Sequence, residues 1–336
     1  MRAPSLSIQT RRTVGPTVGI GVLAFSLGWV AYKAFGAGFA SAGNVPTFID
    51  VALNGLTLAG LYFITAAGFT LIFGLMRVVN MAHGSLYLLG GYVAWSLTAN
   101  HGLGFWPAMV IATVTGGGVG LVMQQLFLRW NLGQDLRQAL ITVALSIVLA
   151  DQMLVHFGGV AETITPPAWL GGSVRLHVYG LQYPSFRLFV LGSAIAVGLL
   201  IWAMIKSTRF GMVIRAGVDD RAMTSALGIN VQLVFAAAFF IGASLAALGG
   251  VLGGTMLSLA PGADSDFLLS SLVVVIIGGL GSLGGAALGA LLLGLVNQLS
   301  SVYLPANYTS YSILLTFGML IVVLAIRPAG FFGRTT

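Results

Sequence analysis

A short polar segment, Asn80-Met-Ala-His83-Gly84-Ser85, separates two long apolar runs. It stands where a helix is expected to begin, close to the inner edge of a membrane. Helix N-termini offer free N–H groups, so polar side chains there either bind an anionic group of a solute or satisfy the backbone at a break between helices. Both interpretations stay open for Asn80 and His83. A lone histidine is a weak indication of a metal ligand, and we expect no metal site.

Other polar residues are isolated within apolar runs. They are Asn54, Asp151-Gln152, His156 and Asn297-Gln298. A buried charge in a bilayer is costly, so Asp151 should face protein or water. A proton-coupled carrier would need such a carboxylate, but Asp151 stands in the outer half of its run, and the sequence shows no second deep carboxylate to pair with it. We therefore expect interhelical hydrogen bonding from the whole set.

Motifs of enzymatic chemistry are missing. The sequence has no phosphate-binding loop of the G-x-x-x-x-G-K-[ST] type, no H-E-x-x-H and no nucleophile elbow. Cysteine is absent, which excludes disulfides, thiol catalysis and cysteine-ligated metals. The sequence therefore predicts a protein without catalytic residues or a cofactor of its own.

Composition indicates the elements that position these residues. Hydrophobic residues make up 57% of the 336 positions and charged residues only 7%, against about 25% in soluble domains. We expect an all-α polytopic membrane protein of about ten spans, with eight to ten plausible, since about 20 residues cross the bilayer. The apolar windows are 15–36, 46–75, 81–99, 104–127, 136–157, 185–206, 230–258, 265–279, 284–303 and 308–326. The window 46–75 is long enough to tilt, and 265–279 is short enough to be re-entrant.

Basic residues predict the orientation. With both termini in the cytoplasm, twelve of the fifteen Lys and Arg residues fall inside and three outside. The outside residues are Lys33, Arg175 and Arg187. This bias accounts for the formal charge of +7 without a nucleic-acid partner. Residues 1–44 form a tail and an extra span, with a cleavable signal as the alternative, and 45–333 form the membrane domain.

Glycine is abundant, at 47 residues, and recurs in small-xxx-small pairs such as Gly116/Gly120 and Gly285/Gly289. Such pairs let helix backbones approach closely within a bilayer. We expect most of these glycines to be packing residues.

Two loops are long enough to touch other proteins. The external loop 158–184 is rich in proline and glycine, which predicts an ordered, turn-rich cap. The cytoplasmic segment 207–230 predicts a short amphipathic helix capped by Asp219 and ended by Gly228. Its apolar stripe would face a partner or lie on lipid headgroups; the stripe is Ala222, Met223, Ala226 and Leu227.

Several motifs resemble those of LivH-type permeases of branched-chain amino-acid ABC importers, in order and spacing over residues 48–333. They are Asn54-Gly-Leu-Thr57-Leu, Gly68-Phe-Thr-Leu-Ile-Phe-Gly74, Val79-Asn-Met-Ala-His-Gly84, Thr208-Arg209-Phe-Gly211…Arg215-Ala216…Asp220…Ala226-Leu-Gly-Ile-Asn230 and Gly278-Gly-Leu-Gly-Ser-Leu-Gly-Gly-Ala-Ala-Leu-Gly289. Asn80-Met81 replaces the commoner Asn-Phe, and the N-terminal span lies outside the motif region.

The resemblance implies a permease subunit of the bacterial inner membrane. Its implied partners are a second, LivM-type permease, two cytoplasmic ATPases that use ATP, and an external solute-binding protein. Residues 209–230 would dock on an ATPase, with candidate contacts Arg209, Gly211, Arg215, Ala216, Asp219, Asp220, Ala222, Met223, Ala226, Leu227 and Gly228. The candidate translocation path is Asn54, Thr57, Asn80, His83 and Gly84, and the candidate binding-protein contacts are Glu162, Trp169 and Arg175.

Other functions remain open at this point. The same low-charge path would suit urea or short amides. A standalone ion-coupled carrier and a passive channel are alternatives of another class, and neither would need the capped cytoplasmic helix.

Overall fold

The computed structural model describes residues 44–76, 79–131, 133–175, 180–213, 223–224, 228, 230–303 and 312–333. The predicted N-terminal span at 15–36 lies outside these residues. Each of the other apolar windows corresponds to a described α-helix. Within the described chain, six helices are long and apolar enough to cross a membrane, as expected of a polytopic membrane protein.

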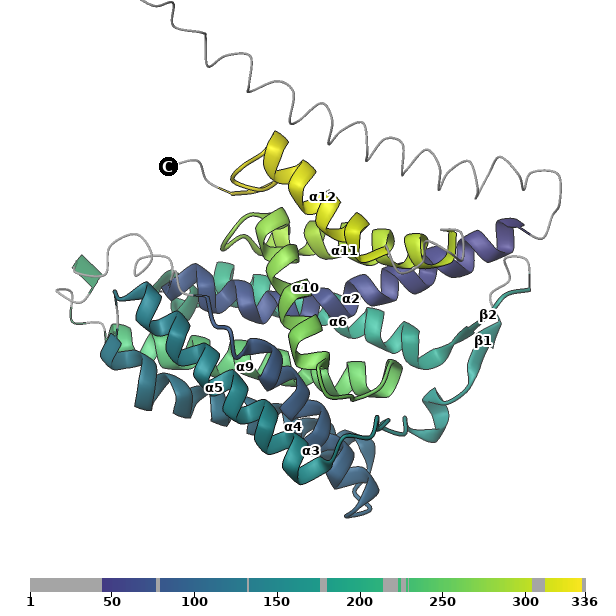
Figure 1. Ribbon diagram of the computed structural model, residues 1–336, viewed down its shortest axis with the longest axis horizontal. Coiled ribbons are helices and arrows are strands. Elements are labelled where there is room, and N and C mark those ends of the chain that lie inside the picture. The colour runs from purple at the N-terminus through teal and green to yellow at the C-terminus, as the bar shows by residue number, and fades with distance from the viewer. Residues whose placement is uncertain are drawn as a thin grey trace, which may run out of the picture.

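The helix bounds follow the apolar windows closely. In chain order the α-helices are α2 (Asn44–Met76), α3 (His83–Ala99), α4 (Phe105–Met123), α5 (Asp135–Phe157), α6 (Ser185–Ser207), α9 (Val231–Met256), α10 (Ala263–Gly278), α11 (Leu283–Tyr303) and α12 (Ser312–Ile326). A π-helical turn, η2 (Gln124–Leu128), and a 3-10 turn, η3 (Arg129–Asn131), extend α4. The short α10, with 16 residues, is drawn steeply inclined to α2, α6 and α9 in Figure 1.

The long helix α2 is the centre of the packing. It contacts α6, α9, α10 and α11, while α3 and α4 pack against α9. In Figure 1, α11 and α12 lie on one side of α2, and α3, α4 and α5 lie on the other. α5 is peripheral, because most of its apolar side chains, including Leu140 and Ile147, are exposed. Lipid or another subunit must cover this face.

Small residues bring the helices together, as the sequence predicted. A Cβ on Gly116 or Gly120 of α4 would clash with Ala247 or Ala243 of α9. Gly285 on α11 lies equally close to the backbone of Gly278 at the end of α10. These contacts confirm that the glycines of both predicted pairs act in packing.

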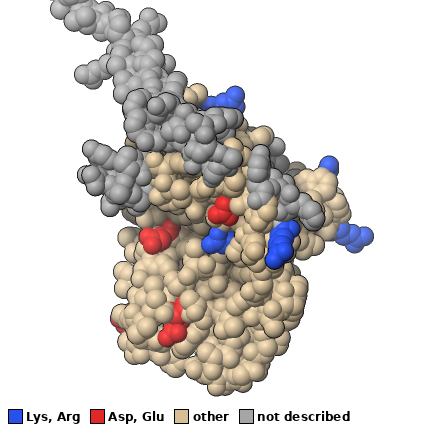
Figure 2. All heavy atoms as spheres, turned by 90° about the vertical axis from the view of Figure 1, so that its right-hand side faces the viewer, with Lys and Arg blue, Asp and Glu red and all other residues tan. Residues whose placement is uncertain are grey.

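The described part of the loop between α5 and α6, residues 158–175 and 180–184, is ordered and rich in turns, as its proline and glycine content predicted. It contains a 3-10 turn, η4 (Ala168–Leu170), and a two-stranded antiparallel hairpin of β1 (Ser173–Arg175) and β2 (Gln182–Pro184). Figure 2 shows the face of the molecule that carries this hairpin, with few charged groups on a mostly uncharged surface.

Candidate functional site

The start of α3 is a tight turn built by Asn80. The Asn80 Oδ1 atom accepts a hydrogen bond from the Ala82 N–H at 3.1 Å, and the Asn80 carbonyl accepts one from the His83 N–H at 3.2 Å. The side chain is buried, and its Nδ2 atom has no partner within the described residues. Asn80 therefore satisfies the backbone at the break before α3, while both N–H donors of its amide group lack a partner in the described chain.

His83 joins α3 to α2. Its Nε2 atom lies 2.9 Å from the carbonyl oxygen of Thr65, which can only accept, so Nε2 carries the proton and donates. The ring meets Phe69 edge-on, with centroids 5.4 Å apart. Nδ1 is buried and without a partner in the described chain. The Ser271 hydroxyl of α10 donates to Thr65 Oγ1 at 3.3 Å, so a polar cluster links three helices.

The next two residues of α3 are held by α10 and α5. Gly84 lies against the backbone of Asp264, where any side chain would clash. The hydroxyls of Ser85 and Ser146 are 2.8 Å apart. The predicted motif residues at the start of α3 are therefore packed between three helices, and they do not protrude from the molecule.

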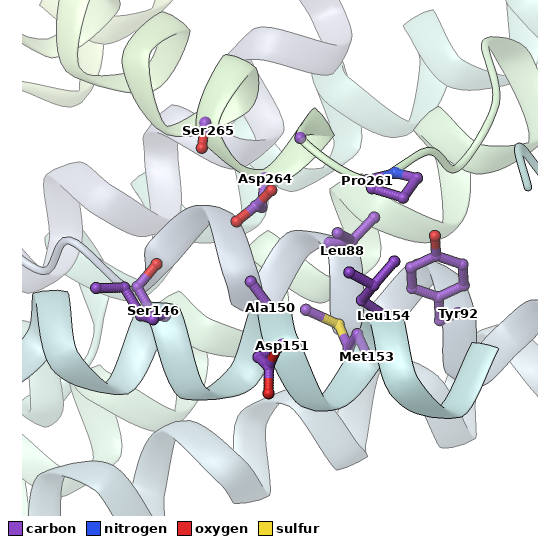
Figure 3. A pocket seen from close by; sticks show the side chains of 12 residues that line it. Leu88, Tyr92, Ser146, Ala150, Asp151, Met153, Leu154, Pro261, Asp264 and Ser265 are labelled. Atoms are coloured by element: carbon purple, nitrogen blue, oxygen red, sulfur yellow. The ribbon is translucent and has the colours of Figure 1, made fainter. Parts of the chain in front are cut away.

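A cavity of about 380 Å³ adjoins this junction, between α3, α5 and the first turn of α10. Figure 3 shows the side chains that line it. They are Leu88, Tyr92, Ser146, Ile147, Ala150, Asp151, Met153, Leu154, Pro261, Asp264 and Ser265, with Gly262 completing the wall. Its volume lies within the range of roughly 300 to 1,000 Å³ that is typical of small-molecule sites.

Two carboxylates, Asp151 and Asp264, line this cavity, and the sequence did not predict the burial of the second one. Asp264 falls between the apolar windows 230–258 and 265–279, so the sequence placed it outside a span. In the structure, the chain after α9 runs along α3, because Gly91 of α3 lies against Leu259. Asp264 is consequently only 7% exposed.

The other polar residues of the spans behave differently from one another. Arg187 of α6 donates to Asn54 Oδ1, which confirms interhelical hydrogen bonding for Asn54. Asp151 and Gln152 are exposed on α5, and neither side chain makes a hydrogen bond with the described part of the chain. For these two residues, interhelical bonding within one chain was a wrong expectation. Asp151 is exposed beside the cavity, consistent with a carboxylate that faces protein or water.

Asn54 and Thr57 belong to a second junction, between α2 and the hairpin. The Tyr183 hydroxyl donates to the Leu53 carbonyl at 3.0 Å and accepts from Thr57 Oγ1 at 2.8 Å. Burial is the larger influence and raises the pKa of Tyr183, while Thr57 and Arg187 lower it. The structure thus divides the predicted path residues into two groups and brings only Asn80, His83 and Gly84 close to the cavity.

The external loop is joined to the chain before α10. Glu162 and Leu259 exchange two backbone hydrogen bonds, of 2.8 and 2.7 Å, and the Ile164 N–H donates to the Gly254 carbonyl. Trp169 is 67% exposed and stacks on Trp106, with centroids 5.9 Å apart. Arg175 is exposed on β1. Trp169 and Arg175 are therefore accessible, whereas the backbone of Glu162 is engaged inside the molecule.

Only part of the predicted coupling segment is described. Arg209 is exposed, and Gly211 is buried against the backbone of Ile205. Met223 is 60% exposed, and Gly228 has a φ of +80°, the conformation expected of a helix-ending glycine. The remaining predicted contacts lie outside the described residues: Arg215, Ala216, Asp219, Asp220, Ala222, Ala226 and Leu227.

Sequence reasoning missed the roles of four residues, three of them at these junctions and one at the start of α9. No sequence pattern indicated that Asp264 is buried, because its depth depends on how the connection between α9 and α10 folds. Tyr183 and Arg187 stood in a loop and at the end of a span, where they read as surface residues. Asn230 could have been found: it precedes an apolar run, and its Oδ1 atom caps α9 by accepting from the Leu233 N–H.

Known proteins resemble this chain over nearly its whole described length. A family model described as the permease component of branched-chain amino acid transport systems matches residues 51–324. The permease protein BraD of the high-affinity branched-chain amino acid transport system of Pseudomonas aeruginosa is 30% identical over 300 residues, which cover 85% of this chain and 96% of BraD. The corresponding LivH of Escherichia coli K12 is 30% identical over 305 residues, with the same coverage. LivM of the same strain is 25% identical over 311 residues, covering 85% of this chain and 70% of LivM.

Proposed function

The chain belongs to the family of permease components of branched-chain amino acid transport systems, and from this premise we propose that it forms the solute path of an ABC importer for branched-chain amino acids. The observation that supports the substrate class most directly is the match to BraD and LivH over 96% of their length. The chain is a multi-pass membrane protein, and in this proposal it lies in the bacterial inner membrane.

The proposed assembly has a second permease, two cytoplasmic ATPases and an external solute-binding protein. The similarity of one chain to both LivH and LivM supports a permease pair of related subunits. The exposed face of α5 also supports it, because Asp151 and Gln152 would be costly against lipid and need water or a protein partner. ATP is used by the partners, and we assign no cofactor to this chain.

The proposed topology has about ten spans and cytoplasmic termini, which the distribution of basic residues supports. In this orientation, segment 209–230 contacts an ATPase, and loop 158–184 contacts the binding protein. Transport is alternating access: the loaded binding protein outside and the ATPases inside stabilise different states of the same helices. Trp169 and Arg175 offer exposed groups for the outer contact, and Met223 offers an exposed group for the inner one.

The first experiment is purification of the tagged chain from its own membranes in mild detergent, followed by mass spectrometry. We expect a second permease and P-loop ATPases to co-purify, and the reconstituted complex to accumulate L-leucine only with ATP and the loaded binding protein. ATP-dependent uptake of urea or short amides in place of leucine would change the substrate class. Transport by the chain alone, without ATP, would make it a carrier or channel and overturn the proposal.

A further inference from the structure

Asp264 is a buried carboxylate without a partner in the described chain. It is 93% buried, since its exposed fraction is 7%, and no hydrogen bond or ion pair within the described residues reaches its side chain. In Figure 3 it projects from α10 toward α5, across the cavity. An ionised group taken out of water normally has an opposite charge or several hydrogen bonds to compensate. The residues that line the cavity include no basic side chain, so they supply no opposite charge.

The position of Asp264 in the first turn of α10 accounts for only part of the stabilisation that its buried negative charge requires. The positive end of a helix stabilises a carboxylate, but Asp266 in the same turn has this position and is exposed to solvent. Burial at the cavity distinguishes Asp264. Within the described residues no group of three or more His, Cys, Asp or Glu side chains could hold a metal ion, so the geometry favours an organic cation.

The rest of the cavity is amphipathic. Its apolar walls come from α3 and α5, through Leu88, Ile147, Met153 and Leu154. Tyr92 contributes a hydroxyl that is buried and without a partner in the described chain. In Figure 3 this hydroxyl points toward the turn at Pro261. A ligand that fits must therefore carry a cation beside an apolar group.

The cavity also lies at the depth that a solute path requires. Leu88 and Tyr92 stand in the middle of α3 (His83–Ala99), so α10 begins partway through the thickness of the membrane domain. Helices that begin inside a membrane direct free N–H groups and first-turn side chains at a bound solute. Irregular backbone at this depth is tolerated where protein or a water-filled cavity surrounds it.

We infer that this cavity is a solute subsite in which Asp264 binds the α-ammonium group of an aliphatic amino acid, while Leu88, Ile147, Met153 and Leu154 contact its side chain. This inference rests on the proposed function, and it adds the site and the group recognised. The neighbouring Gly84 keeps the α3 backbone against Asp264, so the motif at the start of α3 positions the carboxylate.

The chain has no cysteine, so a single introduced cysteine is the only thiol of this subunit, and its labelling is read on this subunit after the complex is separated. Ala150→Cys places a thiol in the cavity wall, and its labelling by a methanethiosulfonate reagent is measured in the reconstituted complex. We expect L-leucine to slow the labelling. 3-Methylbutan-1-amine, which keeps the ammonium group, should also protect, whereas 4-methylpentanoate, which lacks it, should not.

Asp264→Asn tests the carboxylate, with Asp266→Asn as the matched control for charge and helix position. In the Ala150→Cys background, Asp264→Asn should raise the leucine concentration needed for protection by about tenfold to a hundredfold, the cost expected for a charge-assisted hydrogen bond. Asp266→Asn should leave it unchanged, and Asp264→Glu should restore part of the affinity. The analogue series needs no change at Asp264, so it decides the question even if Asp264→Asn does not assemble.

Leucine uptake by the complex without these changes separates the two proposals. If uptake depends on ATP, three results would overturn the subsite and leave the proposed function standing. The first is that leucine does not protect the thiol, and the second is that 4-methylpentanoate protects it while the amine does not. The third is that Asp264→Asn and Asp266→Asn have equal effects. Absence of ATP-dependent leucine uptake would overturn the proposed function, and the subsite with it.

Discussion

Gly84 of α3 lies directly against the backbone carbonyl of Asp264 of α10, although 179 residues separate these two positions along the chain. A Cβ at Gly84 would clash with that carbonyl and with the Leu268 side chain. The contact fixes the first turn of α10 beside the cavity. The glycine that ends the motif Asn80-Met-Ala-His-Gly84 is therefore required by helix packing.

Substituting Gly84 should destabilise the protein. Gly84→Val forces α3 and α10 apart, and overpacking of this kind typically costs about 1–3 kcal/mol. Thermal unfolding in detergent, followed by the loss of monodisperse protein, measures the effect. Gly118→Ala on α4 is the control, because nothing lies within 4 Å of a Cβ there. Equal stability of the two variants would contradict the close contact.

The Thr57–Tyr183 pair should contribute to stability through its hydrogen bonds. Tyr183→Phe removes the donor to Leu53 and leaves Thr57 without its acceptor, at a cost of about 1–2 kcal/mol. Tyr87→Phe should be nearly neutral, because the buried Tyr87 hydroxyl has no partner within the described residues. A double-mutant cycle of Thr57→Val with Tyr183→Phe, read by chemical unfolding, should show coupling. Strict additivity would show that the pair is not formed.

Asp151 should be dispensable for energising transport. It is exposed on α5, and in Figure 3 its carboxylate points away from Asp264. We expect Asp151→Asn to retain ATP-dependent accumulation, measured as radiolabelled uptake in cells, and ATP depletion to stop uptake in both proteins. The ion-coupled carrier would be favoured by a different pair of results. In that case Asp151→Asn would lose accumulation, and a proton gradient would drive uptake by the unmodified protein without ATP.

A charged side chain in the coupling segment should uncouple the ATPases. Ala226→Glu or Gly228→Glu introduces charge into the predicted apolar face or the glycine turn, and Gly228 has the positive φ that other residues adopt at a cost. We expect membrane insertion to persist while uptake and ATPase co-purification are lost. Val160→Glu, on the external loop at a residue 70% exposed, is the control and should leave co-purification intact. Normal uptake in both segment variants would remove the coupling role.

Trp169 should anchor the binding protein. Exposed tryptophans at interfaces are often hot spots, and Trp169→Ala should weaken binding by about 2 kcal/mol, roughly 30-fold in Kd. Surface plasmon resonance on the reconstituted complex measures this affinity. Trp130→Ala removes a comparably exposed tryptophan beside Arg129, far along the chain from the loop, and should have no effect. Equal affinities for both variants would exclude Trp169 from the contact.

The sequence predicted the bounds of the helices better than the depth at which their residues lie in the membrane domain. Windows 81–99, 136–157, 185–206 and 284–303 lie within about two residues of α3, α5, α6 and α11, because a spanning helix needs an apolar run of fixed length. The inclination of α10 was not predictable, because hydropathy carries no information on direction. The depth of Asp264 depends on backbone pairing between Glu162 and Leu259, 97 positions apart, and local patterns do not report such contacts.

That pairing also limits how the external loop can be exchanged between relatives. Residues 162–164 satisfy backbone groups of the chain at 254 and 259, so they act as a structural part of the membrane domain. The turn η4 at 168–170 and strand β1 at 173–175 make no backbone hydrogen bond to that part of the chain. A graft that alters binding-protein recognition should therefore begin after Ile164, because a chimera with its boundary before Glu162 would also replace the backbone segment that pairs with Leu259 before the start of α10.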